Sequence, residues 1–166
     1  MSTTGQAEPD KQAQTRSMSP HWAPWDAREP LEHRTHCHDA RGTAIRCLIV
    51  DDNDHFRQVA SDVLEREGIA VTGVASTSTE ALRQVDELRP DVTLVDIALG
   101  EENGFDLAQQ LTAAAITEQT TVILMSASYD EEDVADMIAA GPAAAFLPKI
   151  DISGRVIREI YRQRRS

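Results

Sequence analysis

The sequence lacks the features of secreted, disulfide-stabilised and membrane proteins. Only 2 of its 166 residues are cysteine, too few for a disulfide framework. Its longest apolar runs are four or five residues, such as 47–50 and 143–147, whereas a membrane-spanning helix needs about 20. The first residues are polar and contain no apolar signal core. We therefore expect a soluble protein with a cytoplasmic location and no membrane partner.

Basic charge is also scarce. The chain has 16 Lys and Arg residues against 28 Asp and Glu residues, so its formal net charge is −12. An acidic protein repels a phosphate backbone, which argues against a nucleic-acid partner. Aliphatic residues are few before residue 44, although this segment holds four of the seven prolines and both tryptophans. Such a segment cannot offset the entropy cost of ordering, so we predict a disordered N-terminal extension at 1–44 and a folded domain at 45–164.

The folded part alternates between apolar runs and amphipathic stretches. The runs are continuous rather than alternating and rich in Val, Ile and Leu, as in strands buried on both faces of a parallel sheet. They are Cys47–Val50, Ile69–Val74, Val92–Val95, Val122–Met125 and Ala143–Leu147. Each is followed by a stretch with helical spacing of apolar residues. This pattern predicts an α/β fold, a (βα)5 doubly wound five-stranded parallel sheet of the flavodoxin-like type.

Polar side chains follow four of the five predicted strands. In a doubly wound sheet, ligands bind beyond the carboxyl ends of the strands, near the point where strand order reverses. We therefore expect the residues at these ends to converge on one edge of the sheet. They are Asp51 and Asp52 after the first strand, Asp96 after the third, Ser126 after the fourth and Lys149 after the fifth.

Adjacent carboxylates at a buried strand end repel each other strongly and need a cation. An oxygen-only site of this kind suits Mg²⁺. Each residue also has a simpler interpretation by itself: an acidic pair in a solvated loop, an Asp96 that caps a turn, a surface lysine. Lys149 is nevertheless the one lysine of the predicted domain, and its compact ammonium suits a single phosphoryl or carboxylate oxygen. Asp91, at the opposite end of the third strand, should be inert.

Together these features resemble the receiver domain of two-component response regulators, and the resemblance covers essentially all of 45–164. The order of an acidic pair, Asp, Ser or Thr, and Lys is similar to that of the family, as are the gaps between these residues. Gly104 follows Asp96 by eight residues, where the family has a glycine that opens the third helix. Phe146 falls where the family has its aromatic switch residue. One departure is Ile150, since the family usually has proline directly after the lysine.

The resemblance implies a role for each site residue. Asp96 would be the phosphoacceptor, receiving a phosphoryl group from the phosphohistidine of a histidine kinase or phosphotransfer protein. Asp52, Asp96 and the backbone carbonyl of Ala98 would hold Mg²⁺, with Asp51 helping through water. The metal would offset the charge of the phosphoryl group.

The resemblance also implies a conformational switch. Ser126 and Lys149 would bind phosphoryl oxygens. Phosphorylation adds about −1.5 to −2 charges, which would draw Ser126 inward and let Phe146 turn into the vacated space. The face formed by the fourth helix, fifth strand and fifth helix would then change shape and bind a downstream protein partner.

We therefore interpret the sequence as a stand-alone, chemotaxis-regulator-like receiver, a phosphorylation-controlled protein–protein switch and not an enzyme. One alternative is an adaptor that keeps the receiver fold but works independently of phosphorylation. Another is a metal-dependent phosphatase with an aspartyl nucleophile. The phosphatase fits poorly, because such enzymes usually place a second acid two residues after the nucleophile, and that residue here is Ala98.

Overall fold

The computed structural model describes residues 43–113, 120–128, 135–136, 138–139, 141 and 143–166. Most of the segment for which the sequence predicts disorder, residues 1–42, lies outside this range. So does most of the expected fourth helix around Val134 and Met137, although the described residues 135–136 and 138–139 are helical.

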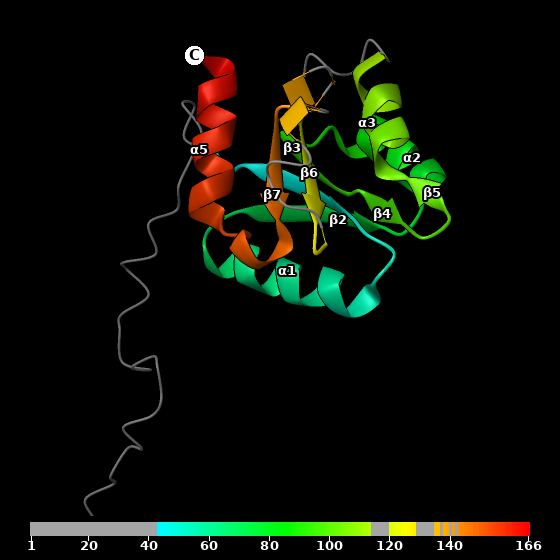
Figure 1. The fold of residues 1–166 in the computed structure, drawn as a ribbon. Helices are drawn as coiled ribbons and strands as arrows, with labels where there is room; N and C mark the ends of the chain where they lie inside the picture. The colour runs from blue at the N-terminus through cyan, green and yellow to red at the C-terminus, as the bar shows by residue number, and fades with distance from the viewer. Residues whose placement is uncertain (1–42, 114–119, 129–134, 137, 140, 142) are drawn as a thin grey trace, which may run out of the picture. The chain divides into compact units, whose positions relative to one another are not determined.

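The core of the domain is a parallel sheet of five strands in the order β2-β1-β3-β6-β7 (Figure 1). All four neighbouring pairs run parallel. The strands are β1 (Arg46–Val50), β2 (Ala70–Ala75), β3 (Val92–Asp96), β6 (Thr121–Ser126) and β7 (Ala145–Pro148). Each strand overlaps its predicted apolar run, so the predicted fold class is confirmed.

Among the helices whose bounds the described residues define, four flank this sheet, and their apolar stripes pack in two separate core clusters. They are α1 (Asp54–Arg66), α2 (Ser78–Leu88), α3 (Gly104–Ala113) and α5 (Gly154–Arg165). Leu48 and Val50 of β1 pack in the cluster that contains α2 and α3 residues. Their neighbours Cys47 and Ile49 pack in the cluster that contains α1 and α5 residues. Successive strand residues point to opposite faces, so α1 and α5 cover one face of the sheet and α2 and α3 the other (Figure 1).

Local sequence signals fix where the helices begin and end. The side chains of Asn53, Thr77 and Ser153 cap the amino ends of α1, α2 and α5 by accepting a hydrogen bond from a backbone N–H three residues later. Gly68, just beyond α1, has a φ of 84°, the left-handed conformation that commonly ends a helix. The amino ends of these three helices and the carboxyl end of α1 therefore follow from short-range chemistry.

The segment after β3 contains a feature that the sequence did not predict. A short antiparallel pair, β4 (Ala98–Leu99) and β5 (Glu102–Asn103), lies between β3 and α3. Gly104 then begins α3 so close to β3 that a Cβ atom there would lie 2.0 Å from the backbone oxygen of Asp96. Only glycine permits this approach, which fixes the backbone around Asp96.

The chain order places the candidate site. From β1 the chain passes to β2 on one side, and then returns to β3 on the other side of β1. The strand order therefore reverses between β1 and β3, where a doubly wound sheet binds its ligands. Asp51 and Asp52 follow β1, and Asp96 ends β3.

Candidate functional site

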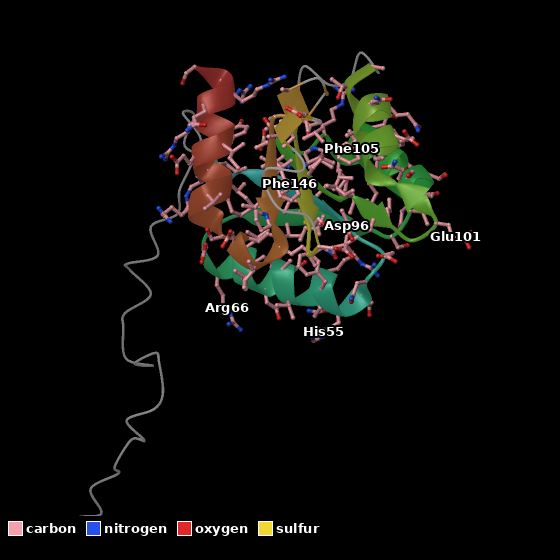
Figure 2. The ribbon with its side chains drawn as sticks, in the orientation of Figure 1. His55, Arg66, Asp96, Glu101, Phe105 and Phe146 are labelled. Atoms are coloured by element: carbon pink, nitrogen blue, oxygen red, sulfur yellow. The ribbon has the colours of Figure 1, made fainter. Side chains whose placement is uncertain are left out.

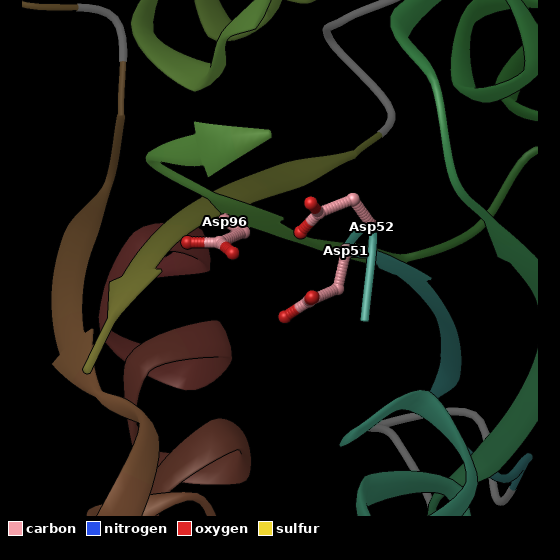
Figure 3. A group of neighbouring side chains, drawn as sticks. All are labelled: Asp51, Asp52 and Asp96. Atoms are coloured by element: carbon pink, nitrogen blue, oxygen red, sulfur yellow. The ribbon is translucent and has the colours of Figure 1, made fainter. Parts of the chain in front are cut away.

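Three carboxylates meet at the reversal point between β1 and β3 (Figure 3). Asp51, Asp52 and Asp96 each offer an oxygen atom, and these atoms all lie within 4.8 Å of one another. Asp51 and Asp96 are buried, with 0% and 4% of their surface exposed, whereas Asp52 is exposed. The cluster is therefore anchored in the core and open on the side of Asp52.

The ammonium of Lys149 lies between the two buried carboxylates. Its Nζ atom is 2.6 Å from Oδ2 of Asp51 and 2.9 Å from Oδ2 of Asp96. The contact with Asp96 has hydrogen-bond geometry. Oδ2 of Asp51 makes the ion pair but no hydrogen bond to any described residue. One ammonium thus contacts two of the three carboxylates, and the cluster with Lys149 keeps a formal charge of −2.

The second oxygen of each buried carboxylate shapes its own loop. Oδ1 of Asp51 accepts a hydrogen bond of 2.8 Å from the backbone N–H of Asn53. Oδ1 of Asp96 accepts one of 3.1 Å from the backbone N–H of Ala98. These bonds to the residue two positions later form Asx turns. They orient both carboxylates so that Oδ2 remains available to Lys149.

Burial and charge shift the protonation equilibria of this cluster. Burial raises the pKa of Asp96 above its usual value, and the nearby charge of Asp51 raises it further, against the opposing effect of Lys149. For Lys149, burial lowers the pKa, but the contacts with Asp51 and Asp96 outweigh burial, so the pKa is raised. Lys149 therefore stays charged at neutral pH and compensates the acidic cluster.

The other residues predicted for the site lie around this cluster. Ser126 ends β6, is buried, and its Oγ accepts a hydrogen bond from the backbone N–H of Ser128. Ala98 begins β4 and is exposed. Phe146 lies in β7, half-buried against the cluster on the α2 and α3 side (Figure 2). The structure thus brings the predicted strand-end residues to one edge of the sheet, while their functional roles stay predictions.

The sequence also singles out Asp91, predicted to be inert, and Ile150, which stands where the family usually has proline. Asp91 lies at the opposite edge of the sheet, where it accepts hydrogen bonds from the backbone N–H of Arg46 and the hydroxyl of Tyr161. It therefore ties strands to α5 and is distant from the acidic cluster. Ile150 lies in a 3-10 turn formed by Lys149–Asp151 and is 92% exposed.

Sequence reasoning missed two residues that contact the site. The Nζ atom of Lys149 lies 4.4 Å from the ring centroid of Phe56. Arg57 donates a hydrogen bond to the backbone oxygen of Asp51 and pairs with Asp54. Helical spacing identifies Phe56 as a core residue of α1, but nothing in the pattern indicates that its ring faces a lysine nearly a hundred residues later.

The sequence is similar to that of known proteins whose family has an acidic site of this kind in the same fold. The family model for the response regulator receiver domain matches residues 47–160. The chemotaxis protein CheY of Thermotoga maritima is 32% identical over 115 residues, which cover 69% of this chain and 93% of that protein. The protein-glutamate methylesterase/protein-glutamine glutaminase of Alkalilimnicola ehrlichii is 37% identical over 116 residues, 66% of this chain and 28% of that enzyme. The chain thus spans about a quarter of the length of the methylesterases it matches.

Solved structures are similar as well. The receiver domain of the putative response regulator NarL from Mycobacterium tuberculosis superposes with a TM-score of 0.62 at 26% identity, over 72% of this chain and 97% of that one. The response regulator domain of Thermotoga maritima CheB superposes with a TM-score of 0.61 at 28% identity, over 72% of this chain and 95% of that one.

In the part of the chain that the structure describes, no helix has the length and apolar character to cross a membrane.

We expect Lys149→Met to destabilise the metal-free protein by about 3 kcal/mol near neutral pH, since removing one partner leaves buried carboxylates uncompensated. The pKa of Lys149 is raised in the fold, so its contribution is complete below the unfolded pKa and is lost only at alkaline pH. Toward acid, Asp96 takes up a proton early because its pKa is also raised. The loss should therefore be smaller at about pH 4.5 than at about pH 7.5.

Urea unfolding in the presence of a chelator measures the loss of unfolding free energy at each of the two pH values. Arg83→Met is the matched control, because Arg83 forms an exposed ion pair with Glu87 and such pairs contribute little. Equal losses in the two variants, or a loss for Lys149→Met that grows toward acid, would show that Lys149 does not compensate the buried carboxylates.

Proposed function

The chain belongs to the response regulator receiver family, and on this basis we propose that Asp96 is the residue that accepts the phosphoryl group. Receiver domains act in two-component signalling, and the family implies a cognate histidine kinase as partner. The observation that carries the assignment is the contact of Asp96 Oδ2 with Lys149 beside Asp51 at the reversal point of the sheet. Asp96 is the carboxylate of β3, with β1 and its acids on one side and β6 with Ser126 on the other.

The proposed transfer is a direct displacement at phosphorus. An oxygen of the Asp96 carboxylate attacks the phosphorus of a phosphohistidine, the P–O bond forms, and the P–N bond breaks with its electrons returning to the imidazole. Positioning and charge stabilisation make up most of the catalysis of such transfers. Lys149 supplies a fixed positive charge beside the accepting oxygen, and the hydroxyl of Ser126 is proposed to donate a hydrogen bond to another phosphoryl oxygen.

The acidic cluster fits a hard divalent cation, and we propose Mg²⁺. Its donors are all oxygens, and the formal charge remains −2 with Lys149 included. Asp52, Asp96 and the backbone carbonyl of Ala98 would hold the ion, with Asp51 acting through water. The ion would offset the negative charge of the phosphoryl group.

The output is proposed to be a protein–protein contact. Phosphorylated Asp96 would draw Ser126 inward, Phe146 would turn toward the vacated space, and the face of the fourth helix, β7 and α5 would change. The near-complete coverage of CheY supports an output carried by the receiver itself, and the site of action would be the cytoplasm. The methylesterase and glutaminase activities in the names of the longer relatives are properties of those proteins, and we do not propose them for this chain.

We expect wild-type protein incubated with a small phosphodonor and Mg²⁺ to gain one phosphoryl group, as measured by intact mass. Asp96→Asn should fold and gain none, because an amide oxygen is a poor nucleophile. Asp91→Asn is the matched control and should be labelled normally, since Asp91 binds Arg46 and Tyr161 at the other edge of the sheet.

Each alternative function gives its own result in this experiment. A phosphorylation-independent adaptor would show no adduct on wild type, and a phosphatase would consume the donor continuously without a lasting adduct. Equal labelling of wild type and Asp96→Asn would refute the assignment of Asp96.

We further propose that residues 45–164 fold as the receiver domain without 1–44. Deleting residues 1–42 should leave the melting temperature and the phosphorylation rate nearly unchanged, because the deleted segment has few aliphatic side chains to bury. Thermal unfolding and the intact-mass assay test this directly. A drop of many degrees would show that Trp22 or Trp25 contributes to the core.

A further inference from the structure

Phe56 completes the surroundings of the Lys149 ammonium. Two carboxylate oxygens, from Asp51 and Asp96, lie within 2.9 Å of Nζ, and the ring of Phe56 faces it at 4.4 Å. This distance is well within the range of about 6 Å for attraction between a cation and an aromatic ring. We propose that Phe56 is a positioning residue, whose ring holds the Lys149 ammonium against the two carboxylates during phosphoryl transfer. The inference rests on the proposed phosphoacceptor function of Asp96.

The position of Phe56 is itself fixed by the acidic cluster. Oδ1 of Asp51 accepts a hydrogen bond from the backbone N–H of Asn53. The side chain of Asn53 caps α1 by accepting a hydrogen bond of 3.1 Å from the backbone N–H of Phe56. The ring of Phe56 contacts the ammonium of Lys149, and this ammonium forms the ion pair with Oδ2 of Asp51. The contacts form a closed circuit, so the ring and the ammonium are placed from the same carboxylate.

An aromatic ring suits this place for a chemical reason. A lysine side chain has a flexible four-carbon stem and three N–H donors, and an oxygen acceptor at the third donor would compete with the carboxylates and with a phosphoryl oxygen. The ring attracts the charge without offering a strong acceptor. It also packs with the core cluster on the α1 and α5 side, and the Lys149 side chain is only 16% exposed. The ammonium is thereby kept from water and directed at the reacting carboxylate.

The contact between ring and ammonium can be observed without any phosphorylation. The chain has two lysines, Lys11 and Lys149, so protein labelled with ¹³C-lysine gives two ε-methylene signals. Ring currents should move the Lys149 signal upfield in wild type. Phe56→Leu, which keeps an apolar side chain but removes the ring, should abolish this shift, and Phe56→Tyr should keep it.

The rate of phosphorylation tests the consequence. With a small phosphodonor and saturating Mg²⁺, Phe56→Leu should be phosphorylated about 2- to 30-fold more slowly than wild type, the range expected from cation–π energies. Phe56→Tyr should restore a rate close to wild type. Phe105→Leu is the matched control, since Phe105 is half-buried against the other core cluster, and it should stay within about 2-fold of wild type.

The outcomes separate the inference from the proposed function. An unchanged rate in Phe56→Leu, a Phe56→Tyr variant as slow as Phe56→Leu, or an equal slowing in Phe105→Leu would overturn the positioning role. A Lys149 signal with no upfield shift in wild type would overturn the contact itself. Absence of any adduct on wild type would overturn the function proposed for Asp96 and the rate effect with it, while the lysine signal would still decide whether the ring holds the ammonium.

Discussion

The site depends on one constraint: a single ammonium must balance carboxylates that the fold has buried side by side. Asp51 and Asp96 end neighbouring strands and are almost fully buried, so their mutual repulsion is costly unless a cation lies between them. Lys149, at the far end of the chain, supplies this cation through two short contacts. The last strand is therefore coupled to the first and third by charge as well as by the sheet, although it is a neighbour of neither.

The two oxygens of each buried carboxylate have different partners. Oδ1 fixes the loop that follows the strand, and Oδ2 meets the lysine. The loop after Asp51 contains Asn53, which begins α1, and α1 in turn carries Phe56 to the lysine. The loop after Asp96 contains Ala98 and leads to Gly104, where helix and strand nearly touch. Local turns and the acidic cluster thus stabilise each other, and the hydrogen bonds and ion pairs of the protein itself orient the carboxylate oxygens.

Much of this arrangement could be predicted from the sequence, because it depends on periodicity and on strand ends. Continuous apolar runs identify buried parallel strands, and the rule for ligands at the reversal point selects the residues that follow them. The β4–β5 pair was not predictable, since two-residue strands carry no periodic signal. The contact of Phe56 with Lys149 was not predictable for a different reason: a helical stripe says which face is buried, but not which polar atom lies across from it. The turn that contains Ile150 begins with Lys149, whose partners Asp51 and Asp96 are distant in the chain.

In the proposed function, the acidic cluster and its single ammonium prepare Asp96, and no other acid, to accept a phosphoryl group with the help of a divalent cation. The most direct test is to phosphorylate the wild-type protein with a small phosphodonor, reduce the acyl phosphate with borohydride, and locate the resulting homoserine by peptide mass spectrometry, with Mg²⁺ present or chelated. We expect homoserine at Asp96 alone and only when Mg²⁺ is present. Homoserine at Asp51 or Asp52, or equal labelling without the ion, would contradict this proposal.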